Sequence, residues 1–372
     1  MDEIELVKKL VNINSENPPG DEGKIAKFIE HTLSEIGVKS EVIEIDKNRF
    51  NVIAEIGQGE GFALSSHMDT VPIGDASVWK HSPLSGKAYG GKIYGRGTTD
   101  TKGGLASILA ALSKVDIKNP KRRLVLLFVC DEEVDSRGSK WIVKNRKKFL
   151  KGVKYGITTE ATGNKIRVAQ KGLVQVKIRF HGKAAHGSKP WNGDNAVDKA
   201  AKFIYELHKN EKQLLHLKDD VLGHGTINIG KISGGVKVNM VPDYCEVDID
   251  RRTVPGETPY TVIRDFRRIL KKACVNAEIE NLCEPTFAFK LNKNSKVIKM
   301  ILDAIRTEVV GDTGYTEAEI YKRMAGVDCV AFGPGDPKVA HAVDEYIEIR
   351  KLKQATSTFE TLIKMWLNGE GI

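Results

Sequence analysis

The chain has 372 residues, of which 41% are hydrophobic and 29% are charged, and its formal net charge is +9. A length beyond roughly 250 residues favours more than one hydrophobic core. The sequence has no run of about 18 apolar residues, the length needed to span a membrane. Residues 1–13 are acidic and amphipathic, which is typical of a helix and not of a signal peptide. The five cysteines are scattered without C-x-x-C spacing, which argues against a disulfide framework and favours a reducing cytoplasm.

The positive charge is compatible with nucleic acid, a membrane surface or an anionic substrate as a partner. The densest basic run is KNRKKFLKGVK, residues 144–154, where we expect a solvated helix face. No RNA- or DNA-binding module accompanies it, so we expect neither a nucleic-acid nor a membrane partner.

The first 160 residues alternate helical and strand patterns, as in an α/β layer fold with a largely parallel sheet. Two nearly continuous apolar runs, GFALSSH at 61–67 and LVLLFVC at 124–130, predict strands that are buried on both faces. From Thr101, apolar residues recur at helical spacing behind a glycine pair. This spacing predicts a helix there and a loop before it.

From about residue 173 the pattern becomes that of an antiparallel strand, with apolar and polar residues alternating up to His181. The next expected elements are a helix at 196–207, strands at 225–233 and 245–252, a helix at 260–274 and a strand at 278–283. This β-α-β-β-α-β order is the ferredoxin-like arrangement. After Pro285 the α/β pattern returns, with a helix at 295–309, a strand at 328–333 and a helix at 352–366. We therefore predict an α/β domain of residues 1–172 and 285–372, with an α+β domain of residues 173–284 inserted into it.

Histidines and acids stand at or just after the ends of the predicted apolar strands. His67 and Asp69 end the strand at 61–67, and their i, i+2 spacing points both side chains to one face. The Asp69 carboxylate would orient a metal-bound His67 through its second ring nitrogen, or it would only cap the strand end. Asp100, in YGRGTTDTKGG, would either cap the next helix or place a carboxylate beside His67. A phosphate site is disfavoured because the glycine spacing fits neither a P-loop nor a dinucleotide fingerprint.

Three more strand ends carry such residues. The acids Asp131, Glu132 and Glu133 follow the strand at 124–130, at the edge where α/β proteins bind ligands. Adjacent carboxylates repel unless a cation neutralises them or one keeps its proton, so the alternative is a solvated acidic turn. Glu160 follows the strand-like YGITT, and His341 lies in a loop after an apolar strand, where a locally bonded histidine is the alternative. Mixed histidine and carboxylate ligands suit Zn²⁺, Co²⁺ or Mn²⁺ better than Ca²⁺ or haem.

In order and spacing these motifs resemble the peptidase M20 metallohydrolases, the family of acetylornithine deacetylase, succinyl-diaminopimelate desuccinylase, aminoacylase and glutamate carboxypeptidases. The resemblance spans essentially the whole chain and rests on SSHMDTVP, GRGTTDTKGG, the DEE triplet, AAHGSKPWNGDNAV, GGVKVNMVP and AHAVDEY. It implies a dizinc-exopeptidase-like mixed sheet flanked by helices. It also implies that the inserted ferredoxin-like domain serves as a lid and as the surface of a homodimer.

The resemblance further implies two divalent metal ions, with zinc as the first expectation and cobalt or manganese as alternatives. One ion would be bound by His67, Asp100 and Glu160, and the other by Asp100, Glu133 and His341. Asp100 would bridge the ions, Glu132 would be the general base, and the peptide bond after Asp100 would be cis. The family's usual Glu-Pro-Thr is EAT at 160–162, and threonines precede Asp100 where smaller residues are common, but no ligand is lost.

In the inserted domain the resemblance singles out His186, in AAHGS, as the group that polarises the scissile carbonyl, often in the partner's active site. The alternative for His186 is a locally bonded loop histidine. The contacts to the substrate carboxylate would be Asn239 and Arg252. Arg252 is also placed to pair with Asp248 or Asp250, and the neighbouring Arg251 leaves the assignment open by one residue.

The motifs thus predict a cytoplasmic enzyme that removes an N-acyl group from an amino acid, or cleaves a dipeptide, by attack of water on the amide. The segment GYTEAE at 314–319 resembles the deacetylase branch, with Glu317 or Glu319 available to a basic side chain, so acetylornithine is the favoured substrate. Succinyl-diaminopimelate desuccinylation and dipeptidase or carboxypeptidase activity are the alternatives within the family. A non-catalytic binding module on the same fold is the alternative from another class; such a module would have lost a ligand or the base.

Overall fold

A computed structural model describes residues 1–370 and separates them into two compact units. The larger unit contains Met1–Val168, Leu291–Val310 and the described residues from Thr316 onward, and the smaller unit contains Ala169–Lys290 and Gly311–Tyr315. The short segment Gly311–Tyr315 therefore belongs to the smaller unit, whereas the sequence pattern placed it in the α/β domain. No helix within residues 1–370 is long and apolar enough to cross a membrane.

A mixed sheet has the strand order β1-β2-β6-β3-β7-β17-β8-β15, with β16 also paired to β8. Its strands belong to the larger unit, except that β15 and the last residues of β8 and β16 fall in the smaller unit. Neighbouring strands in the run β6, β3, β7 and β17 are parallel, whereas β1, β2 and β8 join antiparallel to their neighbours. The mixed sheet implied by the resemblance is thus confirmed. The strands are β1 (Ser40–Asp46), β2 (Arg49–Ile56), β3 (Gly61–His67), β6 (Arg123–Val129), β7 (Val153–Thr158), β8 (Ile166–Gln170), β15 (Phe289–Lys290), β16 (Val309–Asp312) and β17 (Asp328–Ala331).

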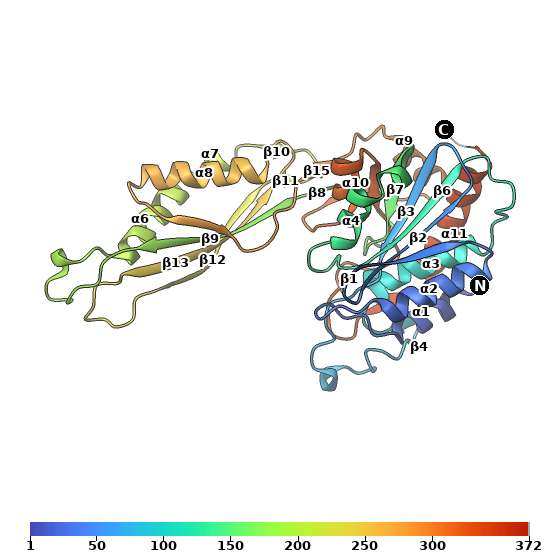
Figure 1. Ribbon diagram of the computed structural model, residues 1–372, viewed down its shortest axis with the longest axis horizontal. Helices are drawn as coiled ribbons and strands as arrows, with labels where there is room; N and C mark the ends of the chain where they lie inside the picture. The colour runs from blue at the N-terminus through green and yellow to red at the C-terminus, as the bar shows by residue number, and fades with distance from the viewer. Residues whose placement is uncertain (371–372) are drawn as a thin grey trace. The chain divides into compact units, whose positions relative to one another are not determined.

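Helices flank this sheet on both sides, which is why β3 is buried along its whole length (Figure 1). Helix α3 packs against α11 and α1 on one side, and α10 packs against α4, β7 and β17 on the other. Every residue of α3 is buried, as its uncharged sequence GGLASILAAL requires. The helices are α1 (Glu3–Val11), α2 (Gly23–Glu35), α3 (Gly103–Leu112), α4 (Arg137–Asn145), α5 (Lys147–Leu150), α9 (Lys296–Ala304), α10 (Ala318–Ala325) and α11 (Ile349–Leu367).

One predicted element is wrong in its second half. The helix expected at 295–309 ends at Ala304, and Val309 begins β16, which pairs with β8. The β-branched pair Val309–Val310 favours extended backbone, and pairing with a strand distant in sequence holds it there. A small separate sheet joins β18 (Tyr346–Glu348), β5 (Lys92–Tyr94) and β4 (Lys87–Tyr89).

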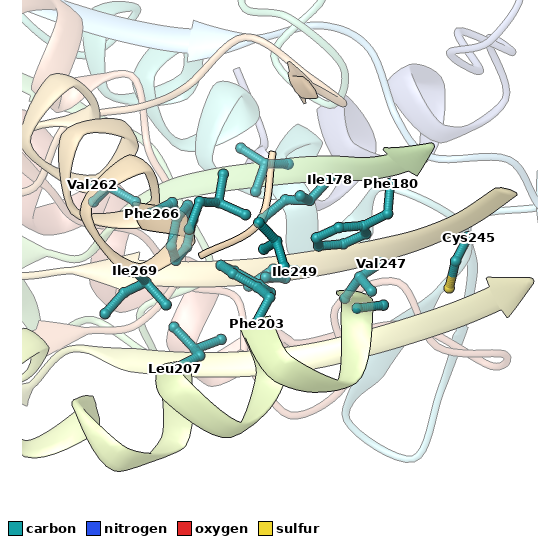
Figure 2. Packing of buried hydrophobic residues seen from close by; sticks show 14 of the residues in the cluster. Ile178, Phe180, Phe203, Leu207, Cys245, Val247, Ile249, Val262, Phe266 and Ile269 are labelled. Carbon is teal, nitrogen blue, oxygen red and sulfur yellow. The ribbon is translucent and has the colours of Figure 1, made fainter. Parts of the chain in front are cut away.

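The smaller unit has the ferredoxin-like order of elements, with the antiparallel sheet β12-β13-β9-β14 and helices α6 and α8 (Figure 1). Its core forms where the helices meet the sheet. Figure 2 shows Phe203 of α6 close to Phe180 of β9, and Phe266 of α8 in the same cluster beside Val262. The elements are β9 (Gly172–His181), α6 (Ala196–Lys209), α7 (Glu211–Leu214), β10 (Lys218–Asp219), β11 (Gly223–His224), β12 (Thr226–Gly234), β13 (Tyr244–Thr253), α8 (Pro259–Lys272) and β14 (Glu278–Asn281).

Candidate metal centre

The predicted metal ligands of the larger unit lie where its parallel strands end. His67 is the last residue of β3, the acidic turn at 131–133 follows β6, and Glu160 follows β7. His341 lies in the loop after β17, and Asp100 lies in the segment Thr98–Lys102 just before α3, where its own backbone is not helical. Because parallel strands end at one edge of a sheet, chemistry carried by distant segments gathers there. The Asp100–Thr101 peptide is cis, as the resemblance implied.

Asp100 lies between two histidines. Its Oδ1 is 3.2 Å from His67 Nε2, and its Oδ2 is 3.4 Å from His341 Nε2, which is also 3.2 Å from Glu133 Oε2. One ligand atom each from His67, Asp100 and Glu160 lie within 4.8 Å of one another, and the same holds for Asp100, Glu133 and His341. The structure therefore gathers the five predicted ligands into two groups that share Asp100.

This cluster holds more negative charge than its own side chains neutralise. Among residues 1–370, Glu133 Oε1 and Glu160 Oε1 are buried without a hydrogen-bond partner. Desolvation, reinforced by Asp100 and Glu133, raises the pKa of Glu160 well above its ordinary value. Desolvation and the nearby Glu160 raise the pKa of Glu132 in the same way. Divalent cations would bind the free oxygens and remove the repulsion, so the residues present fit a two-metal site.

Hydrogen bonds to carboxylates raise the pKa of both histidines, and for His67 the bond to Asp100 does so although burial opposes it. Hydrogen bonds to Asp100 and Glu133 raise the pKa of His341 to about 10. Although burial opposes it, the hydrogen bonds from His341 and His67 hold the pKa of Asp100 well below its usual range. A metal must displace these protons before imidazole nitrogen can ligate it, so metal affinity is coupled to pH.

Residues 63–365 match the model of peptidase family M20/M25/M40. The chain belongs to this family. It is 32% identical over 383 residues to a probable succinyl-diaminopimelate desuccinylase of Staphylococcus aureus (strain MSSA476), covering 93% of each chain. Membership makes it a metal-dependent hydrolase that acts on amide bonds.

Two solved structures share the fold of this M20 chain. The M20 family metallo-carboxypeptidase Sso-CP2 from Sulfolobus solfataricus superposes with a TM-score of 0.79 at 23% identity, covering 99% of this chain and 100% of that one. The YXEP protein of Bacillus subtilis, described as a dinuclear metal binding peptidase from the M20 family, superposes with a TM-score of 0.74 at 17% identity, covering 100% and 98%. At these identities the similarity establishes the fold alone.

In this M20 chain, Asp69 orients His67 through a different atom from the one predicted. His67 Nδ1 is 2.9 Å from the Asp69 backbone oxygen, whereas the Asp69 carboxylate is 3.7 Å away. The carbonyl therefore accepts the Nδ1 proton and leaves Nε2 toward Asp100. The carboxylate instead accepts the backbone N–H groups of Glu132 at 3.1 Å and Glu133 at 3.2 Å. It holds the turn that carries the predicted base.

The M20 motif around His341 contains a further buried acid, Glu345, that the sequence motifs did not single out. Glu345 is buried, and its Oε1 accepts the backbone N–H groups of Thr99 at 2.8 Å and Asp100 at 3.2 Å. Its Oε2 accepts a hydrogen bond from Arg96 Nη1 at 2.7 Å. One loop thus carries a predicted ligand, His341, and an acid, Glu345, that clamps the backbone at Asp100. The signal was available, because AHAVDEY places this acid four residues after the histidine.

The predicted substrate residues of the M20 chain lie in the smaller unit. His186 is exposed, and its Nδ1 accepts the backbone N–H of Ser188 at 3.1 Å, so the neutral ring carries its proton on Nε2. Asn239 is exposed as well, and its backbone oxygen accepts the N–H of Gly187 at 2.8 Å. These contacts place His186 and Asn239 beside each other.

The arginine pair of β13 divides into a buried and a partly exposed member. Arg251 is 3% exposed, and its guanidinium pairs with Glu257. Arg252 is one third exposed and pairs with Asp250, its Nε lying 2.9 Å from Oδ1. Pairing with Asp250 was one of the two local alternatives for this residue, and Arg252 is the more exposed of the two arginines.

The two acids of GYTEAE are buried, whereas the sequence motifs predicted that one of them would pair with a basic side chain of the substrate. Glu317 is 0% exposed, and Glu319 is 1% exposed and pairs with Arg323 one helical turn away. Both belong to the interior of the larger unit, at the start of α10.

Proposed function

We propose that this chain is a two-metal amidohydrolase that removes a succinyl-type acyl group from an amino acid. The observation that carries the reaction is the pair of ligand groups sharing Asp100, with the Glu132 turn held beside them by Asp69. The relative at 32% identity, named a probable succinyl-diaminopimelate desuccinylase, favours the succinyl substrate. Acetylornithine, the substrate favoured by the sequence motifs, stays a prediction and is tested in parallel.

The proposed ligands are His67, Asp100 and Glu160 for one ion and Asp100, Glu133 and His341 for the other, with zinc tested before cobalt or manganese. Such ions, when bound, would lower the pKa of a bound water towards neutrality and polarise the scissile carbonyl. The YXEP protein of B. subtilis, which shares the fold, is itself described as dinuclear.

Glu132 acts as the general base and then as the general acid. It takes a proton from the attacking water and returns it to the nitrogen of the leaving amine as the amide bond breaks. A carboxyl group whose pKa is raised by desolvation retains a transferred proton long enough to deliver it. Asp69 keeps the group in place through the backbone of the turn.

The smaller unit supplies the substrate contacts in this proposal. His186 donates a hydrogen bond from its Nε2–H to the carbonyl oxygen, and Asn239 and Arg252 bind the substrate carboxylate. We also propose that this unit serves as a lid and as the surface of a homodimer, and that the enzyme works in the cytoplasm.

The test is turnover of N-succinyl-diaminopimelate, N-acetylornithine and a simple dipeptide by the same preparation. Each is measured as purified, after chelation and after addition of zinc, cobalt or manganese, with Glu132→Gln as the matched inactive control. The proposal predicts that chelation abolishes activity, that metal restores it, and that the succinyl substrate has the highest kcat/KM. Activity that survives complete chelation contradicts the two-metal reaction, and a higher kcat/KM for another substrate contradicts the acyl group.

A further inference from the structure

A chain of buried polar side chains lies behind the turn that carries Glu132. It begins at Arg49, whose side chain is 5% exposed and whose Nη2 is 2.7 Å from Glu22 Oε1 and 2.9 Å from Asp131 Oδ1. Arg49 Nη1 donates to Asn17 Oδ1 at 3.2 Å. The arginine of β2 thus joins the N-terminal stretch that contains Asn17 and Glu22 to the turn at Asp131.

Asn17 connects Arg49 to the residues beside the metal centre. Its Nδ2 donates to Asp69 Oδ2 at 2.9 Å and to Asp131 Oδ1 at 3.0 Å. Both amide hydrogens are therefore used on the two carboxylates that flank the turn. Asp69 in turn accepts the backbone N–H groups of Glu132 and Glu133. The path from Arg49 to the backbone of the base consists of two side chains.

The backbone of this turn has a conformation that requires support. Asp131 has φ of 68°, in the left-handed region, directly before Glu132. Its carboxylate is held from two directions, by Arg49 on one side and by Arg137 Nε at 2.8 Å on the other. Without these partners, two buried carboxylates, Asp69 and Asp131, would face each other across Asn17, which is unfavourable.

We propose that Asn17 and Arg49 are positioning residues for the reaction, which act by fixing the Glu132–Glu133 turn through Asp69 and Asp131. This inference rests on the proposed role of Glu132 as the base. The hydrogen bonds converge on the backbone of the turn, and a buried ion pair contributes little net stability by itself, so positioning explains the arrangement better than stability does.

The first test compares Asn17→Leu with Asn210→Leu, a matched loss of a buried, hydrogen-bonded asparagine from the smaller unit. Asn17→Leu is expected to lower kcat by about 10- to 100-fold, a usual effect of removing support from a catalytic group, while KM changes far less. Arg49→Met is expected to act in the same direction, and Arg49→Lys, which keeps the charge, to recover part of the loss. Equal losses of kcat in Asn17→Leu and Asn210→Leu would overturn the proposal.

The second test separates positioning from general damage. In a Glu132→Asp background, whose base is already displaced, Asn17→Leu is expected to cost much less kcat than in the wild type. If Asn17→Leu lowers kcat by the same factor in Glu132→Asp as in the wild type, Asn17 does not act through Glu132 and the proposal is wrong. The isosteric Asn17→Asp serves the same comparison if Asn17→Leu does not fold.

The third measurement needs no substrate. Hydrogen exchange of the peptide spanning residues 130–135 is expected to quicken in Asn17→Leu and to stay unchanged in Asn210→Leu, because the Glu132 and Glu133 amides lose their fixed acceptor. Unchanged exchange in Asn17→Leu refutes the anchoring. If the wild type turns over no substrate, the proposed function fails, whereas this measurement still decides whether the anchoring exists.

Discussion

Replacing Glu317 with glutamine removes a buried carboxylate that burial makes costly to ionise. Glu317 is 0% exposed, and among residues 1–370 neither of its oxygens has a hydrogen-bond partner. His67 and, after it, the Ser139 hydroxyl lower the pKa of Glu317, although that hydroxyl donates its own proton to the Ser136 carbonyl oxygen. Burial is the dominant effect, and it raises the pKa of Glu317 from 4.5 to about 7.

The sign of the pH dependence follows from this raised pKa. The folded chain binds the Glu317 proton more tightly than the unfolded chain does. The contribution of this proton to the free energy of unfolding is therefore fully present below pH 4.5 and is lost as the pH rises through about 7. At about 1.4 kcal/mol per pH unit, the rise from 4.5 to about 7 corresponds to a loss of about 3 kcal/mol. Glutamine has the same shape and no charge, so Glu317→Gln escapes this loss.

The assay is thermal unfolding of metal-free wild type and Glu317→Gln, at about pH 5 and about pH 8. The variant is expected to gain in unfolding temperature relative to the wild type as the pH rises. Glu319→Gln is the matched control, because Glu319 is equally buried two residues away but is paired with Arg323, and it is expected to show no such gain. A difference between Glu317→Gln and the wild type that is the same at both pH values refutes the reasoning.

Three further outcomes are expected. Glu132→Ala should keep its metals by elemental analysis and lose nearly all turnover, since it removes the base and no ligand; an active variant would rule out that role. Glu345→Gln should weaken metal affinity by about 10- to 100-fold in a competition titration, because the clamp on Asp100 is loosened, and wild-type affinity would show that the clamp is dispensable. Metal affinity of the wild type should rise steadily with pH, because His341, with a pKa of about 10 in the metal-free protein, must lose its proton to ligate; an affinity that does not change with pH would contradict this coupling.

Much of the fold and the gathering of the site followed from local patterns. The apolar runs at 61–67 and 124–130 predict buried strands, and the position of His67 and the acidic turn at their ends follows from the chain itself. The division of the ligands into two groups sharing Asp100 was implied only by the family resemblance, because the spacing of these residues along the chain does not determine it.

What the sequence did not reveal depends on contacts between distant segments. Asp69 offers both a carbonyl and a carboxylate, and only the folded chain shows that the carbonyl meets His67. Asn17 and Arg49 meet the acidic turn across more than 80 residues, so no periodicity marks them. For the same reason α9 was predicted too long, because the strand that follows it forms by pairing with β8.

The shared carboxylate of Asp100 is the centre of the proposed chemistry, and it is tested most directly by the metal content of the chain. Elemental analysis after zinc loading and removal of excess metal should give two ions per chain for the wild type, as two ligand groups require. Asp100→Asn, which weakens a ligand of both groups, should lose both ions, whereas Glu160→Gln should lose one. A wild type with one ion or none, or an Asp100→Asn variant that retains both, would contradict the two-metal site.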